Sequence, residues 1–458
     1  MNIRKRKSLG VWLVMACICC MMGSLSAETF GLFEYEVNGE SITITSYPKD
    51  AVGAVDIPAN INGKPVTSIG NLAFHNCFYL TSVTIPLSVT SIGEGAFDAC
   101  QALTSITIPN RVTSIGDYAF SACTSLKSIT IPSSVTSLTG APFAFCDGMK
   151  SIIVDPHNAN YSSLDGVLFN KSQTTLLQCP CGKTGSITIP NSTTIIGGNA
   201  FNHCTLLTSI TIPSSVTTIG DFAFVDCIGL TSVTIPSSVT SIGGNAFMDC
   251  IGLTSVTIPS SVTSIRESTF TCCTGLTSVT IPASVTSIAE SAFADCSSVK
   301  VFTVDPHNAN YSSLDGVLLD KKQTELIHYP VGKVGGVSIP ASVTKIKSHA
   351  FSSCTILSSI TIPASINIIE SHAFSYCTSL VSITIPNSVT QIGDYAFSSC
   401  ANLTSAHFTG NAPTIDACVF DKAASDFTVY YLDGKTGFTS PKWNGYKAQV
   451  DLTPQKVK

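Results

Sequence analysis

Apolar and polar residues alternate in short segments along most of the chain. In one such segment Val83 and Ile85 are apolar, whereas Ser82 and Thr84 are polar. Because successive side chains of a β-strand point to opposite faces, this pattern predicts a short strand with Val83 and Ile85 directed inward. Pro86 has no backbone N–H to donate to a neighbouring strand, so we expect the strand to end there.

A second apolar pattern follows each predicted strand. Ile92 is expected to turn the chain back under the core, and Gly93 to allow a tight bend. Ala96, Phe97 and Cys100 stand four, five and eight residues after Ile92. This spacing favours one or two helical or 3-10 turns that face inward, on the side opposite the sheet.

The whole unit recurs along the chain. The Ile, Val or Phe that ends each predicted strand stands at positions 85, 108, 131, 154, 189, 212, 235, 258, 281, 304, 339, 362, 385 and 408. Most steps are 23 residues, but the steps from 154 to 189 and from 304 to 339 are 35. No unit can bury its apolar side alone, so the units are expected to stack into one solenoid with a parallel sheet of about 14 strands, about 65 Å long.

One Phe and one Cys keep the same place in nearly every repeat. We expect the Phe residues to form one internal stack, because none of them leaves its phase. The in-phase cysteines are predicted to be free, buried thiols, since the parallel Cβ directions of adjacent coils suit a disulfide poorly. They are Cys77, Cys100, Cys123, Cys146, Cys204, Cys227, Cys250, Cys273, Cys296, Cys354, Cys377 and Cys400. Cys179 and Cys181 are out of phase and are expected either to form a surface disulfide or to be two separate thiols.

The motif L-x-x-I-x-I-P-x-S-V-T-x-I-G-x-x-A-F-x-x-C stands almost unaltered at 230–250 and 380–400. Its period and apolar pattern are typical of leucine-rich repeats. The sequence resembles the BspA-like class of bacterial leucine-rich repeats from about residue 30 to 450. The resemblance implies an exported protein, and several members of the class act as adhesins that bind host, matrix or other cell-surface proteins. It supplies no binding residues that can be transferred to this chain.

The two long steps carry nearly identical inserts, expected at 155–184 and 305–334. The residues from Asp155 to Leu168 recur unchanged from Asp305 to Leu318. In the first copy, Val167–Phe169 and Thr175–Leu177 flank a polar turn and predict a β-hairpin. The Asp, Asn and His residues could be calcium ligands, but they lack the spacing of a calcium loop and are better explained as turn formers.

The ends of the chain depart from the repeat. A hairpin around Asn38-Gly39 is expected to cap the first coil, and the aromatic tail with Trp443 and Tyr446 to cap the last one rather than to bind a partner. The expected layout is a signal peptide at 1–27, an N-terminal cap at 28–56, the solenoid at 57–425 and a C-terminal cap and tail at 426–458.

Charge is sparse and its placement indicates export. The chain has 458 residues, 12% of them charged, and a formal net charge of -5. The basic run Arg4–Lys7, the apolar run Leu9–Met22 and the small residues Gly23–Ala27 have the order of a secretory signal peptide. A lipoprotein signal ending at Cys17 is the alternative. The apolar run is too short for a membrane span. Removal of the signal leaves a net charge of about −9, which argues against nucleic acid or anionic lipid as a partner.

No catalytic motif is present, so we expect neither an enzyme nor a bound cofactor or metal. The predicted function is that of an extracellular, secreted or surface-associated monomeric rod that binds a protein ligand. A structural surface-layer protein and a carbohydrate-binding surface are the alternatives; the strand face is a Ser/Thr ladder with few aromatic residues, which disfavours the latter. Departures from that ladder, together with the insert tyrosines, are the candidate protein-binding residues: Ile153, Tyr161, Val301, Tyr311 and His407. The hypothesis is that each hairpin lies beside its strand and forms a raised patch there.

Overall fold

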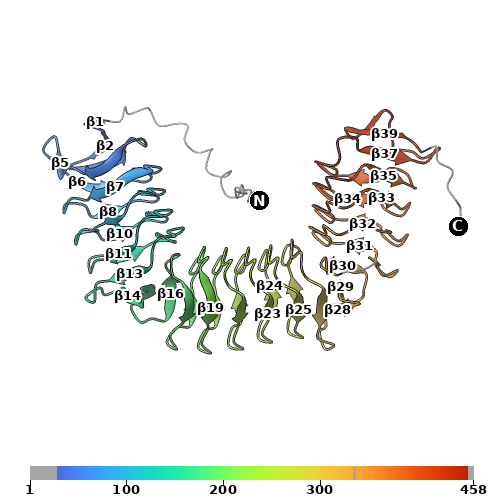
Figure 1. Cartoon of the computed structure of the whole chain (residues 1–458), viewed down its shortest axis with the longest axis horizontal. Helices are drawn as coiled ribbons and strands as arrows, with labels where there is room; N and C mark the ends of the chain where they lie inside the picture. Colours follow the sequence, from blue (N-terminus) through green and yellow to red (C-terminus); the bar gives the residue numbers. More distant parts are fainter. Residues whose placement is uncertain (1–27, 334–336, 452–458) are drawn as a thin grey trace.

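The computed structural model describes residues 28–333 and 337–451. It is a β-solenoid of stacked parallel strands, in which most coils contribute one strand to each of two faces (Figure 1). The expected signal peptide lies outside the described residues. No helix in the described part of the chain has the length and apolar character of a membrane span.

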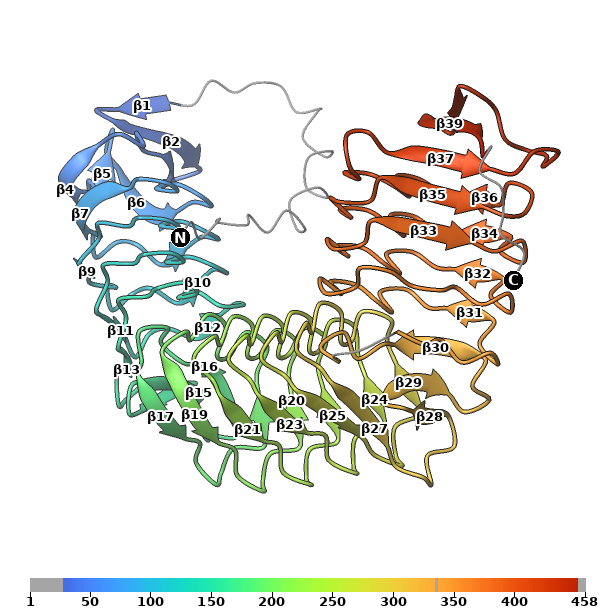
Figure 2. The same cartoon turned by 45° about the vertical axis from the view of Figure 1, so that its right-hand side comes forward.

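One face, here called the long-strand face, consists of the alternating segments predicted from the sequence. Val83 and Ile85 are buried, whereas Thr84 is exposed, as predicted. The strands of this face are β4 (Val52–Asp56), β7 (Tyr79–Thr84), β9 (Ser105–Ile106), β11 (Ser128–Ile131), β13 (Ser151–Val154), β17 (Gly185–Thr188), β19 (Leu207–Thr211), β21 (Ser232–Thr234), β23 (Ser255–Thr257), β25 (Ser278–Ile281), β27 (Val301–Val304), β33 (Ser382–Ile385), β35 (Ser405–Phe408), β37 (Thr428–Tyr431) and β39 (Tyr446–Val450). In Figure 2 the strands from β17 to β27 lie side by side along the bottom of the molecule.

The second face, here called the short-strand face, was not predicted. It is formed mainly by pairs of residues such as Ser91–Ile92, which bury the Ile and stack in parallel register on the next coil. Two residues are too few to show a strand period in the sequence. The strands are β3 (Ser41–Ser46), β6 (Lys64–Ile69), β8 (Ser91–Ile92), β10 (Ser114–Ile115), β12 (Ser137–Leu138), β18 (Ile195–Ile196), β20 (Thr218–Ile219), β22 (Ser241–Ile242), β24 (Ser264–Ile265), β26 (Ser287–Ile288), β31 (Lys345–Ile346), β32 (Ile368–Ile369), β34 (Gln391–Ile392) and β36 (Thr414–Ile415).

The Ala-Phe-x-x-Cys segments connect the two faces, and we call them the turn edge. Helical turns were expected here, but the described residues contain hydrogen-bonded turns and no helix. In one coil Phe222 and Asp226 have left-handed φ angles of 59° and 57°. The N–H groups of Phe222, Phe224 and Asp226 donate to the next coil, at 3.0, 2.7 and 3.0 Å. Two left-handed residues per unit end any helix, and the hydrogen bonds between coils replace those of a helix.

The glycine at the end of the short strand has a different role from the one expected. Gly93 does not have a positive φ. A Cβ atom at Gly93 would lie 2.7 Å from the backbone N of Asn71 and 2.8 Å from the backbone C of Gly70. The glycine therefore allows adjacent coils to approach closely rather than allowing a tight bend.

The in-phase Phe rings form three stacks instead of one. The rings stack from Phe74 to Phe143, from Phe201 to Phe293 and from Phe351 to Phe420, with centroids 4.7 to 5.8 Å apart. The first and second stacks end where an insert interrupts the repeat.

The in-phase cysteines are buried, as predicted, and stand as free thiols in the structure. Nine of the twelve thiols donate to the carbonyl of the Phe one coil earlier, for example Cys250 to Phe224 at 3.0 Å. Burial raises the pKa of Cys77 to about 11, and that of Cys250 well above the ordinary value.

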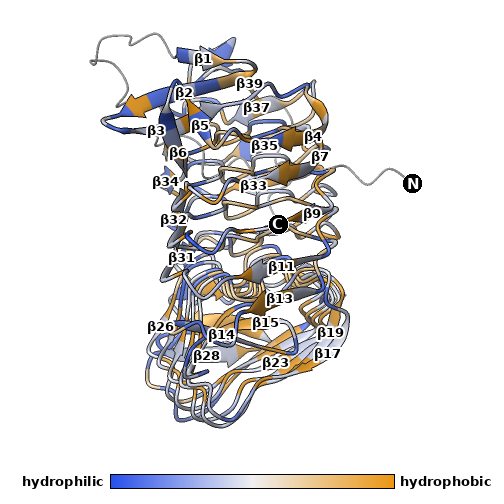
Figure 3. Cartoon of the chain, turned by 90° about the vertical axis from the view of Figure 1, so that its left-hand side faces the viewer, coloured by the Kyte–Doolittle hydropathy of each residue, from blue (hydrophilic) through white to orange (hydrophobic). Residues whose placement is uncertain are grey.

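The solenoid is elongated and bent at both inserts. Figure 1 shows three straight arms that together form a U, with corners near β14–β16 and β28–β30. Three separate hydrophobic cores correspond to the three arms and meet at the inserts. In Figure 3, which looks onto the N-terminal arm, hydrophobic segments recur in coil after coil.

Both ends of the solenoid are covered by strands and loops that do not follow the repeat. At the N-terminus β1 (Glu28–Phe30), β2 (Phe33–Asn38) and β3 are antiparallel, and β5 (Asn60–Ile61) pairs with β6. The Tyr47 ring lies 5.3 Å from the first ring of the Phe stack, Phe74. At the other end β38 (Lys442–Trp443) pairs with β39, and Trp443 is buried 5.4 Å from the Phe408 ring. These contacts agree with the predicted capping role of the aromatic tail.

Candidate functional site at the two inserts

Each insert is a three-stranded antiparallel sheet. The first contains β14 (Tyr161–Leu164), β15 (Val167–Asn170) and β16 (Thr175–Gln178). The second contains β28 (Tyr311–Leu314), β29 (Val317–Asp320) and β30 (Glu325–His328). The predicted hairpins are confirmed. The outer strands β14 and β28 were missed, because Tyr-Ser-Ser-Leu has too few apolar residues to predict a strand.

The middle strand of each insert is a wall between two cores. In β15, Leu168 packs in the core of the first arm, whereas Val167 and Phe169 pack in that of the middle arm. In β29, Leu318 packs in the core of the middle arm and Leu319 in that of the third. The uninterrupted apolar run Val167–Phe169 was the sequence signal for this arrangement, since a strand buried on both faces does not alternate. The hairpin is therefore internal and not the raised patch that we expected.

Across each insert the flanking coils touch at the turn edge. Asp295 accepts hydrogen bonds from the hydroxyls of Ser352 and Ser353, at 2.7 and 2.6 Å. At the first insert the rings of Phe145 and His203 lie 5.2 Å apart. The insert separates the coils elsewhere, so the turn edge is on the inside of each bend. We call the two bends the first corner and the second corner.

The two insert tyrosines are hydrogen-bonded within the chain. The Tyr161 hydroxyl accepts from the Leu138 N–H at 2.9 Å, and the Tyr311 hydroxyl accepts from the Ile288 N–H at the same distance. Both rings are half-buried. Each tyrosine therefore caps the last short strand before a corner. Their predicted role as binding anchors is not tested by this arrangement.

The Asp-Pro-His-Asn-Ala-Asn segment is a hydrogen-bonded turn. Buried Asn158 donates to the carbonyls of Pro132 and Val135, at 2.8 and 3.0 Å. Its Oδ1 accepts from the N–H groups of Asn160 and Tyr161. Among the described residues no group of three or more His, Cys, Asp or Glu side chains could hold a metal ion.

The other three candidate residues lie on the long-strand face. Ile153 and Val301 are 47% and 38% exposed. Val301 has the turn residue Gly316 beside it, whereas the nearest outward neighbour of Ile153 is Thr130 on the preceding strand. His407 stacks on Tyr430 at 4.8 Å, and its Nδ1 lies 3.1 Å from a carboxylate oxygen of Asp451. The five candidates thus form no single cluster.

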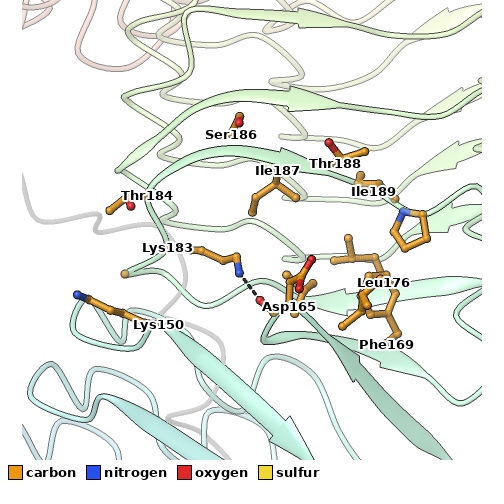
Figure 4. A pocket seen from close by; sticks show the side chains of 14 residues that line it. Lys150, Asp165, Phe169, Leu176, Lys183, Thr184, Ser186, Ile187, Thr188 and Ile189 are labelled. Carbon is orange, nitrogen blue, oxygen red and sulfur yellow. Dashed lines mark hydrogen bonds between the residues drawn. The ribbon is translucent and has the colours of Figure 1, made fainter.

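A cavity opens at the first corner, on the long-strand face. Its volume is about 660 Å³. It lies between the insert turn and β17, and Figure 4 shows Lys183 donating a hydrogen bond to the backbone oxygen of Asp165 at its mouth. The lining residues are Lys150, Leu164, Asp165, Val167, Phe169, Leu176, Gly182, Lys183, Thr184, Ser186, Ile187, Thr188, Ile189 and Pro190. No sequence pattern signals this cavity, because the cavity results from the separation of two strands whose counterparts in the regular coils are neighbours.

The out-of-phase cysteines lie inside the first corner rather than at the surface. Cys179 and Cys181 are 1% and 2% exposed and are free. A hydrogen bond with the Cys204 thiol lowers the pKa of Cys181. The pKa of Cys204 is raised well above its ordinary value by its contacts with Cys179 and Cys181 and by burial.

The second corner has different residues at the same places. His328 replaces Gln178, and Tyr329 replaces Cys179. The His328 ring is 3% exposed and lies 5.7 Å from the Phe293 ring and 6.0 Å from that of Phe302. Burial lowers the pKa of His328 to about 3.

Several solved structures are similar to this chain. A leucine-rich repeat protein from Eubacterium ventriosum has 23% sequence identity and a TM-score of 0.47, covering 92% of this chain and 98% of its own. One from Bacteroides ovatus has 22% identity and a TM-score of 0.42, covering 93% and 99%. The pneumococcal vaccine antigen PcpA has 18% identity and a TM-score of 0.40, covering 89% and 94%. No curated protein matches the chain significantly.

The model of one protein family matches most of the chain. That family is the BspA type leucine rich repeat region, and the match covers residues 56–175, 173–300 and 329–432. These ranges include every Phe of the three ring stacks. The chain therefore belongs to the BspA-type leucine-rich-repeat family.

Proposed function

We propose that this chain is exported and acts at the cell surface as a protein-binding repeat protein, an adhesin for matrix, host-cell or bacterial-surface proteins. The basic and apolar runs before Gly23 support export. The observation that carries the proposal is the first corner, where exposed Ile153 interrupts the Ser/Thr ladder near a cavity of about 660 Å³. An exposed apolar side chain beside a concave site is typical of a binding surface.

The regular faces offer less for a partner to recognise. Outward positions such as Ser232 and Thr234 repeat the same short polar side chains from coil to coil. Such a ladder has few of the large side chains that dominate protein interfaces. The two corners break this regularity, and we place binding there rather than along an arm.

Capture from lysates tests the proposal. The mature chain, residues 28–458, is immobilised and exposed to matrix proteins and bacterial cell lysates, and bound proteins are identified. Ile153→Asp is expected to weaken capture of a specific partner about tenfold, since it replaces an apolar contact with a charge. Thr234→Asp on β21 is the matched control and should leave capture unchanged, because it adds the same charge to the same face in the regular part of the middle arm.

A structural surface-layer role is the competing function. It predicts that the mature chain assembles with itself and captures no protein in a way that depends on Ile153. Capture that is equal for wild type and Ile153→Asp, together with regular arrays in electron micrographs, would favour this alternative.

A further inference from the structure

One strand edge at the first corner has backbone groups without a neighbouring strand. In the described part of the sheet, β17 pairs with β19 and with no other strand. The Gly185 N–H donates to the carbonyl of Leu206, just before β19, at 3.2 Å, and the Ile189 N–H donates to that of Thr211, the last residue of β19, at 3.1 Å. In a parallel sheet alternate residues direct their backbone groups to opposite edges. The N–H and C=O groups of Ser186 and Thr188 therefore point away from β19, and both residues line the cavity.

The opposite side of the corner is closed by the insert. The Ile152 N–H of β13 donates to the carbonyl of Gly166 at 2.8 Å. The Val154 N–H of the same strand donates to the Ser163 hydroxyl at 3.0 Å. The insert thus covers the edge of β13 and leaves the edge of β17 facing the cavity.

The chemistry of the cavity restricts what can bind there. Among its apolar lining residues, Val167, Phe169 and Leu176 are buried, whereas Leu164 is 41% exposed and offers the apolar surface. Its mouth carries Lys150 and Lys183, whereas Asp165 is the one acidic residue that lines it. In the part of the chain that the structure describes, no carboxylate forms an ion pair with Lys150.

We propose that the free edge of β17 binds an extended segment of a partner protein as an added β-strand. The backbone of Ser186 and Thr188 supplies the hydrogen bonds. An apolar side chain of the segment packs on Leu164, and an acidic side chain near one end lies beside Lys150. Strand addition of this kind draws affinity from the main chain and specificity from alternate side chains. The inference rests on the proposed function and names the chemistry of the partner.

Synthetic peptides test the inference without knowledge of the partner. The probe is a fluorescein-labelled ten-residue peptide in which Val and Thr alternate and two Glu stand at one end. Its binding to residues 28–458 is measured by fluorescence anisotropy. The matched control peptide is N-methylated at alternate residues on the pairing edge, so it keeps its side chains but cannot donate to the Ser186 and Thr188 carbonyls. We expect the control to bind at least about tenfold more weakly.

Variants of the protein locate the site. Ser186→Pro removes an N–H that the β19 ladder does not use, and proline is tolerated at a strand edge. It should weaken binding of the Glu peptide about tenfold, whereas Ser186→Ala should change it less than about twofold, because the backbone is kept. Lys150→Glu should weaken binding of the Glu peptide and strengthen binding of a peptide that has Lys in place of each Glu. Thermal melting of each variant verifies that the fold is retained.

Equal binding of the N-methylated and unmodified peptides, or an absence of binding by the wild type, overturns the inference. If the wild type does not bind the peptides and Ser186→Pro does not change capture of a partner, while that capture still depends on Ile153, strand addition is wrong and the proposed function stands. If the wild type binds the peptide but captures no protein, the proposed function fails and the peptide site remains.

Discussion

The two corners share a wall but differ in the segment that follows it. Residues 155–168 and 305–318 are identical, and both form the same capped, three-stranded wall. After the wall, the first corner continues with Gln178, Cys179 and a paired β17, whereas the second continues with His328 and Tyr329. Tyr329 stacks 4.8 Å from Phe351 and extends the third ring stack. The comparison shows that the same wall stands at both bends, while the segments that follow it differ in sequence and packing.

The largest expected difference between the corners concerns their last Phe rings. Phe143→Ala and Phe293→Ala should each cost about 3–5 kcal/mol of unfolding free energy through lost burial and a cavity. Phe293→Ala should cost more unfolding free energy, because the Phe293 ring contacts Phe302 and His328 as well as Phe270. The Phe143 ring contacts Phe120 alone among the described rings. Urea denaturation followed by circular dichroism provides the measurement. A greater loss for Phe143→Ala would contradict the packing described for the second corner.

Acid should destabilise the second corner through His328. Its pKa is lowered from 6.5 to about 3 in the folded state, so the unfolded chain binds a proton at a higher pH than the folded chain does. The stability contribution is intact above pH 6.5 and is lost as the pH falls toward 3, by about 3 kcal/mol at pH 4. His328→Gln, which restores the residue of the first corner, should remove this part of the acid sensitivity.

The control for this titration is the reciprocal change. Gln178→His should introduce a similar acid sensitivity at the first corner, where the Gln178 side chain now accepts from the Phe143 N–H at 3.4 Å. Stability is measured by urea denaturation at pH 7 and pH 4. Equal pH dependence of wild type and His328→Gln would show that His328 does not remain neutral in the folded protein.

The turn glycines of the two inserts should differ by a smaller amount. Gly166 and Gly316 have φ angles of 76° and 83°. A Cβ atom would lie 2.8 Å from the Ser151 side chain at Gly166, but 3.3 Å from that of Val301 at Gly316. Gly166→Ala should therefore cost about 2 kcal/mol and Gly316→Ala about 1 kcal/mol. Thermal melting ranks the two variants, and the reverse order would contradict the closer approach at the first corner.

The capping tyrosines should give the smallest effect, and an equal one at both corners. Tyr161→Phe and Tyr311→Phe should each cost about 1 kcal/mol, because the N–H groups of Leu138 and Ile288 lose their acceptors. Faster amide exchange at these two N–H groups is the measurement. A change in partner capture without any change in exchange would show that the tyrosines act as binding anchors instead.

The sequence predicted the parts of the fold that depend on local patterns. Val83 and Ile85 are inward-facing, the in-phase Cys and Phe are internal, and Val167–Phe169 forms a hairpin with the strand that begins at Thr175. The expected helical turns are not found among the described residues, because residues such as Phe222 adopt left-handed conformations that their side chains do not favour. Neighbouring coils impose these conformations through hydrogen bonds, and no local pattern records them.

The candidate site was predicted only in part for a related reason. Ile153 and Val301 could be identified as departures from a polar ladder, and both are exposed. The cavity and the free edge of β17 could not be identified from the sequence. They exist only where a long strand does not pair with the long strand before it in the chain. Whether those two strands pair depends on how far the insert separates them, and this separation involves residues on both sides of the corner.

Residue-resolved hydrogen–deuterium exchange at the first corner tests the central claim most directly. In the free protein the amides of Ser186 and Thr188 are expected to exchange nearly as fast as unprotected amides, while those of Ile187 and Ile189 are protected by β19. When the Glu peptide or a captured partner is bound, Ser186 and Thr188 should become protected as well. Protection of both amides in the free protein, or no change in their exchange with a partner bound, would contradict a binding edge at this corner.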